Sequence, residues 1–273
     1  METEIIILFC VIDDYLKCIN HKDDIQSKMT TAEIMTVTIA AARFFNGNQE
    51  QSCQFFKEHH YVNYMLSKSQ FNRRLHAIKL HIWEDLQQLT STVFKQLNES
   101  QEYAIDSFPV AVCQNIRISR CKIYQHKDYH GYVASKKVYF YGLRVHMIVT
   151  TKRQPIEIIF APGSVSDAKI APQFDFNLPE GATAYADSLY TNYEHEENLK
   201  QHSGINLLPA RKKNSKRPHI PAIEFLIQHS RKKVETTFSC ITGLFPKKIH
   251  AVTAKGFELK LLCFILAYSI SFL

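Results

Sequence analysis

The spacing of apolar and polar residues predicts a helical first part of the chain. Thr30 and Glu33 have the spacing of a capping box, an apolar-rich run follows over 34–45, and Gly47 is a stop signal. Ser67 and Gln70 repeat that spacing and open a second predicted helix that runs to residue 89. The apolar residues of this helix recur at helical intervals: Phe71, Leu75, Ile78, Ile82 and Leu86.

After residue 102 the apolar period changes from helical to strand-like. The pattern predicts strands over 104–112, 136–150, 156–163, 182–187 and 205–210. It predicts helices over 193–204, with Gly204 as the stop, and over 222–244. We therefore expect an α/β protein with a mixed five-stranded sheet flanked by helices, and an N-terminal all-helical domain.

The predicted domain boundary lies where the period changes, giving a helical domain over 1–98 and a second domain over 99–273. Arg73, Arg74 and Lys79 lie among the apolar residues of the second helix. Two interpretations remain open for this region: a small DNA-binding subdomain that resembles a helix-turn-helix, or an ordinary helical subdomain with a solvated basic face.

Composition and charge narrow the class of protein only slightly. The 273 residues are 45% hydrophobic, which is enough for a large core, and the net charge of +7 suits a polyanionic partner without requiring one. The seven cysteines form no CxxC pair, as expected for reduced thiols. The apolar run over 261–273 is short for a membrane span, so we interpret it as a buried core helix.

Three carboxylates lie where a polar residue needs an explanation. Asp106 interrupts an apolar strand, Asp187 ends the fourth predicted strand, and Glu235 borders the apolar stripe of the last long helix. If the strands and this helix pack together, the three acids converge. Converging carboxylates repel unless a cation lies between them, and Mg²⁺ or Mn²⁺ prefers such oxygen ligands.

Each acid also has a simpler interpretation. Asp106 can serve as a cap or a surface strand end, and Asp187 as a turn residue. Glu235 lies four residues after Arg231, which is the spacing of an ordinary helical ion pair. The histidines His126 and His130, like His146, lack the spacing of a transition-metal site, and we interpret all three as core or DNA-proximal residues.

Several longer segments resemble insertion-sequence transposases of the DDE type, with most similarity to the 982-type branch. These segments are AIDSFPVAVCQNIRI, DYHGYVASKKVYFYGLRVHMIVT, YADSLYTNYEHEE, LLPARKKNSKR and RKKVETTFSCITGLFPKKIHAVTAKGFELKLL. The resemblance runs from near residue 1 to the C-terminus. It implies an RNase H-like catalytic domain over 99–273 with a metal-binding triad at Asp106, Asp187 and Glu235.

The match is incomplete around the last acid. Related transposases carry a Tyr, Arg, Glu, Lys signature there, and Arg231 matches its Arg position. Gln228 stands at the Tyr position and Thr242 at the Lys position. We expect a basic contact to come instead from one of three nearby lysines: Lys247, Lys248 or Lys255.

The resemblance implies a DNA transposase that cuts at the ends of its element and joins the 3′-hydroxyls to target DNA with two Mg²⁺ or Mn²⁺ ions. It also implies a homo-oligomer on DNA and a prokaryotic, cytoplasmic, nucleoid-associated location. Expected DNA contacts are Arg211, Lys212, Lys213, Lys216, Arg217, Arg231, Arg73 and Arg74. For the basic residues at 211–217, the alternative is a solvated surface loop. For the function, the alternatives are a nuclease of the same fold without strand transfer, or a non-catalytic DNA-binding protein from a decayed element.

Overall fold

The computed structural model describes residues 1–134 and 136–273, which form two compact units. One unit is helical and comprises Met1–Leu89 and Cys240–Leu273, and the other contains the sheet and comprises Thr90–Ser239. The C-terminal segment groups with the N-terminal helices because the last helix packs against the second one. The mixed α/β class and the helical N-terminal region are confirmed. The domain boundary at residue 98 stays a prediction.

The helical unit is built around one buried helix, α2 (Thr31–Phe44), which contacts α1 (Glu2–Cys18), α3 (Gln49–Glu58) and α9 (Ala254–Ser269). Both predicted capping boxes are present, at Thr30 before α2 and at Ser67 before α4 (Lys68–Ala77). Each hydroxyl accepts a hydrogen bond from the third amide of its helix, which satisfies a donor that the helix leaves unpaired.

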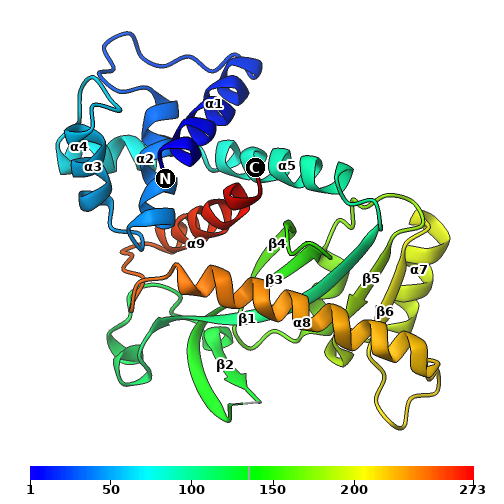
Figure 1. Cartoon of the computed structure of the whole chain (residues 1–273). Helices are drawn as coiled ribbons and strands as arrows, with labels where there is room; N and C mark the ends of the chain where they lie inside the picture. Colours follow the sequence, from blue (N-terminus) through cyan, green and yellow to red (C-terminus); the bar gives the residue numbers. More distant parts are fainter. Residues whose placement is uncertain (135) are drawn as a thin grey trace. The chain divides into compact units, whose positions relative to one another are not determined.

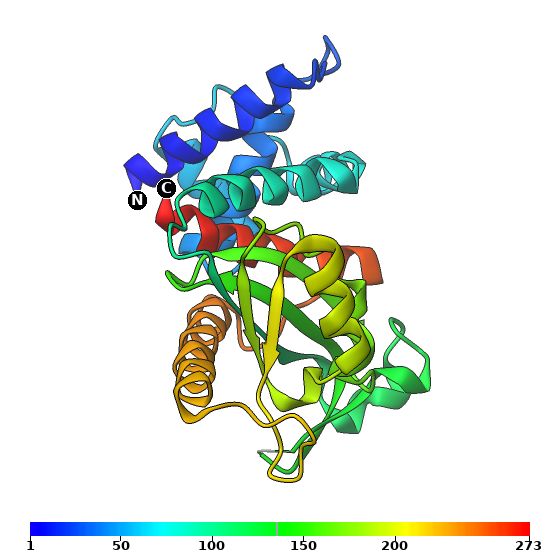
Figure 2. The ribbon, with the colours of Figure 1, turned by 90° about the vertical axis from the view of Figure 1, so that its right-hand side faces the viewer.

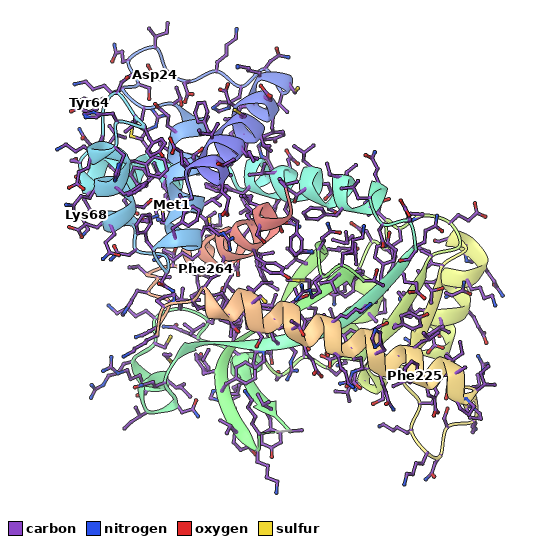
Figure 3. All side chains as sticks on the ribbon, in the orientation of Figure 1. Met1, Asp24, Tyr64, Lys68, Phe225 and Phe264 are labelled. Carbon is purple, nitrogen blue, oxygen red and sulfur yellow. The ribbon has the colours of Figure 1, made fainter. Side chains whose placement is uncertain are left out.

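Gly47 ends the turn after α2, as predicted, and the structure gives two reasons for glycine at this position. Its φ angle is +77°, a region that side chains disfavour, and a Cβ atom here would lie 2.8 Å from the ring of Phe264. Phe264 belongs to α9 and is labelled in Figure 3. The close approach lets α9 pack beside α2.

The prediction of a single helix after Ser67 is wrong, because the segment forms two helices, α4 and α5 (Leu80–Gln96). Ile78 is extended, with φ −65° and ψ 124°, and it ends α4. The break keeps the apolar residues on either side at three- and four-residue spacing, so periodicity alone does not reveal it.

The apolar run near the C-terminus forms part of α9, where nearly every residue from Leu259 to Ile270 is buried. The interpretation as a core helix is confirmed. Within residues 1–134 and 136–273, no helix has the length and apolar character that a membrane span requires.

Within residues 1–134 and 136–273, the sheet unit has six strands rather than the five predicted. They are β1 (Glu102–Cys113), β2 (His130–Val133), β3 (Val138–Thr150), β4 (Pro155–Pro162), β5 (Thr183–Ala186) and β6 (Asn206–Pro209). The order is β2-β3-β1-β5-β6, and β4 also pairs with β3. The strand that was not predicted is β2, whose four residues pair with the first residues of β3.

Strand directions divide the sheet at β1. On one side β1 is antiparallel to β3, which is antiparallel to β2 and β4; on the other side β1 is parallel to β5, and β5 to β6. The connection between β5 and β6 contains α7 (Tyr193–Ser203), which ends at the left-handed Gly204 as predicted. Figures 1 and 2 show α8 (Pro221–Gly243) crossing one face of the sheet and α7 covering the other.

Short helical turns occupy the remaining connections of the chain. They are α6 (Asp167–Ile170), η1 (Asn115–Arg120), η2 (Lys127–Tyr129), η3 (Ala171–Gln173), η4 (Ser188–Tyr190) and η5 (Ile270–Phe272). Two of them, α6 and η4, contact each other beside the end of β5. This pair brings additional polar residues next to Asp187.

Candidate active site

Strand register places two of the predicted acids side by side. β1 and β5 are parallel, and the last pair in their register is Ile105 with Ala186. The next residues are therefore Asp106 and Asp187, at the carboxyl end of β5, where ligands of open α/β sheets commonly bind. Asp187 is the first residue beyond the strand and precedes η4.

The apolar neighbours of Asp106 hold its strand against α8. Ile105 is fully buried, and the Phe108 ring lies 4.6 Å from the ring of Phe238 on α8. Because side chains alternate across a strand, Asp106 and Phe108 share the α8 face. Burial raises the pKa of Asp106 to about 7, against a smaller lowering by the Ser107 amide and by Arg231.

α8 supplies the third predicted acid together with Arg231. The Arg231 guanidinium lies 3.4 Å from Asp187 Oδ1 and 3.9 Å from Glu235 Oε1. Glu235 is the most exposed of the acids, with 61% of its side chain accessible, against 21% for Asp187. The structure thus brings Asp106 and Asp187 together, and Glu235 joins them through Arg231.

The donor chemistry suits a hard divalent cation, because Asp106 and Asp187 offer carboxylate oxygens at the same level of two adjacent strands. In the part of the chain that the structure describes, however, no three His, Cys, Asp or Glu side chains are gathered closely enough to hold a metal ion. Arg231 lies between Asp187 and Glu235 and supplies the positive charge there. Of the three acids, Asp106 and Asp187 are therefore the two that are placed to share a metal ion.

A second polar cluster lies on the opposite face of β1, and the sequence analysis missed most of it. Ser107 donates to Asp167 Oδ1 at 3.4 Å, and His146, opposite Ser107 in the register, is hydrogen-bonded to the Tyr190 hydroxyl at 2.8 Å. Asp167 Oδ1 is 3.8 Å from His146 Nδ1. Arg144 donates a hydrogen bond to the Ser107 hydroxyl at 3.4 Å. We call these residues the buried cluster.

Burial controls the charges in the buried cluster. It lowers the pKa of His146 to about 3, so the imidazole is neutral at ordinary pH, and it raises the pKa of Asp167. His146 is thus a core residue, in line with its sequence interpretation. The only signal for Asp167 was its place after Ser166 at the start of a four-residue helix, which is too weak to predict a site.

The basic loop 211–219 after β6 is anchored by its two arginines. Arg211 pairs with Glu196 through both guanidinium NH groups and is only 5% exposed, while Arg217 pairs with Glu197. Both guanidinium groups lie over the ring of Tyr193, at 4.9 and 4.8 Å from its centroid. The exposed lysines of the loop are Lys212, Lys213 and Lys216, and Arg217 is also exposed, with 54% of its side chain accessible.

In the helical unit, Arg73 is exposed, whereas Arg74 is held by Asp23 at 3.1 Å and by Ser27. A cavity of about 790 Å³ lies within the same unit, between the end of α2, α4 and the start of α9. Lys248 and Lys255 line it, and the three predicted acids do not. The cavity is therefore separate from the acidic site.

The mixed sheet, with Asp106 inside β1 next to Asp187 at the end of β5, defines an α/β protein with an acidic site. Residues 95–246 match the family model described as the transposase DDE domain. The match covers more than half of the chain, so the chain belongs to this family of transposases, and all three predicted acids lie within it. Comparisons with curated proteins and with solved structures gave no match.

Proposed function

We propose that this protein is an insertion-sequence transposase, of the 982-type branch, that binds the ends of its element, cuts phosphodiester bonds and joins the 3′-hydroxyl ends to target DNA. Asp106, Asp187 and Glu235 are its proposed catalytic and metal-holding residues. The observation that carries the proposal is the register of β1 and β5, which sets Asp106 beside Asp187, with Arg231 linking Asp187 to Glu235.

The proposed fold of the catalytic domain, over 99–273, is RNase H-like. Support comes from the sheet order β4-β3-β1-β5-β6, with β1 antiparallel to β3 and parallel to β5. In this proposal β2 is an additional short strand. The helical domain over 1–98 contacts DNA through Arg73, whereas Arg74 acts within the domain because Asp23 and Ser27 already hold it.

Phosphodiester cleavage is slow because the phosphate repels nucleophiles and the departing alkoxide is a poor leaving group. Asp106, Asp187 and Glu235 would hold two Mg²⁺ or Mn²⁺ ions, which would supply positive charge to the phosphodiester during cleavage. The chain itself positions the acids, since Ile105 and Phe108 fix the strand that carries Asp106. Arg231 is placed to hold a non-bridging phosphate oxygen beside Asp187.

In this proposal, lysine side chains on the same side of the sheet unit hold DNA through its phosphate backbone. Lys212, Lys213 and Lys216 are exposed, and the arginines of the loop hold it in place through Glu196 and Glu197. Such contacts fix the position of a duplex without reading its sequence. On DNA we expect a homo-oligomer, at the nucleoid in the prokaryotic cytoplasm, where the substrate lies.

The test uses labelled duplexes that carry the element ends, incubated with Mg²⁺ or Mn²⁺. Wild type is expected to nick the ends, and Asp106→Asn to lose this cleavage while remaining folded. The matched control is Asp175→Asn, which makes the same change at an exposed acid of the same unit. Undiminished metal-dependent cleavage by Asp106→Asn would contradict the assignment. A strand-transfer assay with target DNA separates the transposase from a nuclease that only hydrolyses.

A further inference from the structure

The first turns of α8 expose an apolar surface next to the basic loop. Phe225 is 67% exposed and the preceding Ile220 is 65% exposed, although large apolar side chains usually avoid water. Figure 3 labels Phe225 on the N-terminal part of α8. Its ring is stacked with that of His229, with 6.2 Å between centroids and 16° between planes.

Exposed lysines precede and follow Phe225 along the chain, in the 211–219 loop and on α8. The loop leads into α8 and is anchored by Arg211 at its start, by a 2.9 Å hydrogen bond between Tyr193 and Ser215 in its middle, and by Arg217 near its end. On α8 itself, Lys232 lies seven residues after Phe225 and therefore on the same side of the helix, where it is exposed. The surface thus combines an exposed ring with positive charge: Phe225, Lys212, Lys213, Lys216 and Lys232.

The distance to the acidic site suits a continuous strand of nucleic acid. Phe225 precedes Glu235 by ten residues, which corresponds to about 15 Å along a helix. At the 3.4 Å rise of a B-form strand, this distance covers about four nucleotides. A strand held at the acids therefore reaches Phe225 within a few bases of the cut.

We propose that Phe225, with His229 beside it, is a stacking platform for an unpaired base of the DNA strand that the acidic site holds. The inference rests on the proposed function and adds a specific contact to it. Lysines select a polyanion, and a planar exposed ring offers a base a stacking surface whatever its sequence. A second copy of the same surface is disfavoured, because a two-fold contact sets the lysines of one copy against those of the other.

Binding of a thymidine 20-mer, and of its blunt duplex with deoxyadenosine 20-mer, tests the platform by fluorescence anisotropy. Phe225→Ala is expected to weaken binding of the single strand about 5- to 100-fold, in line with the contribution of one stacked base. Binding of the duplex is expected to stay within about twofold, because its bases are paired and its backbone contacts are unchanged. The matched control, Ile220→Ala, removes an equally exposed apolar group without a ring and is expected to leave both affinities unchanged.

Phe225→Trp gives a second readout. The single native tryptophan, Trp83, is fully buried, so a change in emission on adding the single strand reports on position 225. We expect quenching in Phe225→Trp and none in wild type. Such quenching supports stacking even if Phe225→Ala folds poorly.

The outcomes separate this inference from the proposed function. If wild type cuts element ends but Phe225→Ala binds the single strand as wild type does, the platform is wrong and the transposase proposal stands. If Phe225→Ala instead turns a dimer into a monomer with unchanged DNA affinity, the surface is an interface between copies and the platform is likewise wrong. If wild type binds neither form of DNA and cuts nothing, both proposals fail.

Discussion

The two faces of β1 carry acids of different character at neighbouring positions. On the α8 face, Asp106 of β1 lies beside Asp187 at the end of β5, and the guanidinium of Arg231 reaches Asp187 and Glu235. On the opposite face, one residue along, Ser107 enters the buried cluster with Asp167 and His146. In the first group Asp187 and Glu235 keep accessible side chains, whereas His146 and Asp167 of the second group are almost sealed from water.

The difference shows how burial separates support from chemistry. The buried cluster links its members by hydrogen bonds, with a neutral His146 bonded to Tyr190 and Ser107 bonded to Asp167, so we infer that it supports the strand. On the α8 face Asp187 and Glu235 keep accessible side chains and share the guanidinium of Arg231. We infer that changes on the α8 face affect cleavage, and that changes in the buried cluster affect stability.

The largest expected effect concerns the α8 face. Asp187→Asn and Glu235→Gln each remove one anionic donor and are expected to lower metal-dependent cleavage about a thousandfold, the equivalent of several kcal/mol in the transition state. The thermal unfolding midpoint should not fall, because neither side chain is buried. If a variant loses stability together with cleavage, the inference that changes on the α8 face affect cleavage alone is contradicted.

The buried cluster gives the second prediction. Asp167→Ala leaves the Ser107 hydroxyl and its neighbours without their acceptor and is expected to lower the free energy of unfolding by about 1–3 kcal/mol. Urea denaturation measures this change. Cleavage per folded molecule should stay within a few-fold of wild type. If cleavage disappears while stability is unchanged, Asp167 belongs to the catalytic group.

The third prediction follows from the neutral state of His146. Its pKa is about 3 when folded and about 6.5 when unfolded, so between these values the unfolded chain binds more protons. Stability from this group is therefore complete above pH 6.5 and is lost as the pH falls below it. At pH 5 the loss is about 2 kcal/mol.

His146→Gln removes this titration. The difference in unfolding free energy between wild type and the variant, measured at pH 7 and again at pH 5, should move in favour of the variant at pH 5. The raised pKa of Asp106, about 7, acts in the opposite direction: Asp106 stabilises the fold at low pH, and this contribution is lost as the pH rises from about 4 to 7. Wild type and variant share this contribution, so it cancels in the difference between their unfolding free energies. Equal differences at both pH values would mean that His146 is not buried as a neutral group.

The smallest expected effect concerns the basic loop. Lys213 is exposed, so Lys213→Ala is expected to lower the slope of log affinity against log salt by about one for duplex DNA, with no change in stability. Binding titrations at several salt concentrations measure the slope. An unchanged slope would mean that this lysine faces away from the DNA.

The sequence predicted features that depend on local chemistry. Both capping boxes, the stop at Gly204 and five of the strands follow from residue types within a few positions of one another. It also singled out Asp106, Asp187 and Glu235, because an acid in an apolar context is a local anomaly; their catalytic roles stay predictions. Features that depend on contacts between residues far apart in the sequence were not predicted.

The missed features depend on partners that are far away in sequence. Asp167 gains its place from Ser107, sixty residues earlier, and nothing beside it indicates that contact. Arg211 and Arg217 pair with Glu196 and Glu197 of α7, which no local pattern indicated, and their predicted DNA contacts stay predictions. The break at Ile78 preserves the apolar period on which its prediction rested. Tertiary contacts decided each of these cases.

The central claim, that Asp106 and Asp187 share a divalent ion, is tested most directly by calorimetric titration of Mn²⁺ into wild type, Asp106→Asn and the Asp175→Asn control. Wild type and control are expected to bind Mn²⁺ equally, and more tightly at pH 8 than at pH 6, because ionised carboxylates are required and the pKa of Asp106 is about 7. Asp106→Asn should lose this binding and its pH dependence. Equal Mn²⁺ binding by Asp106→Asn and wild type would contradict the account.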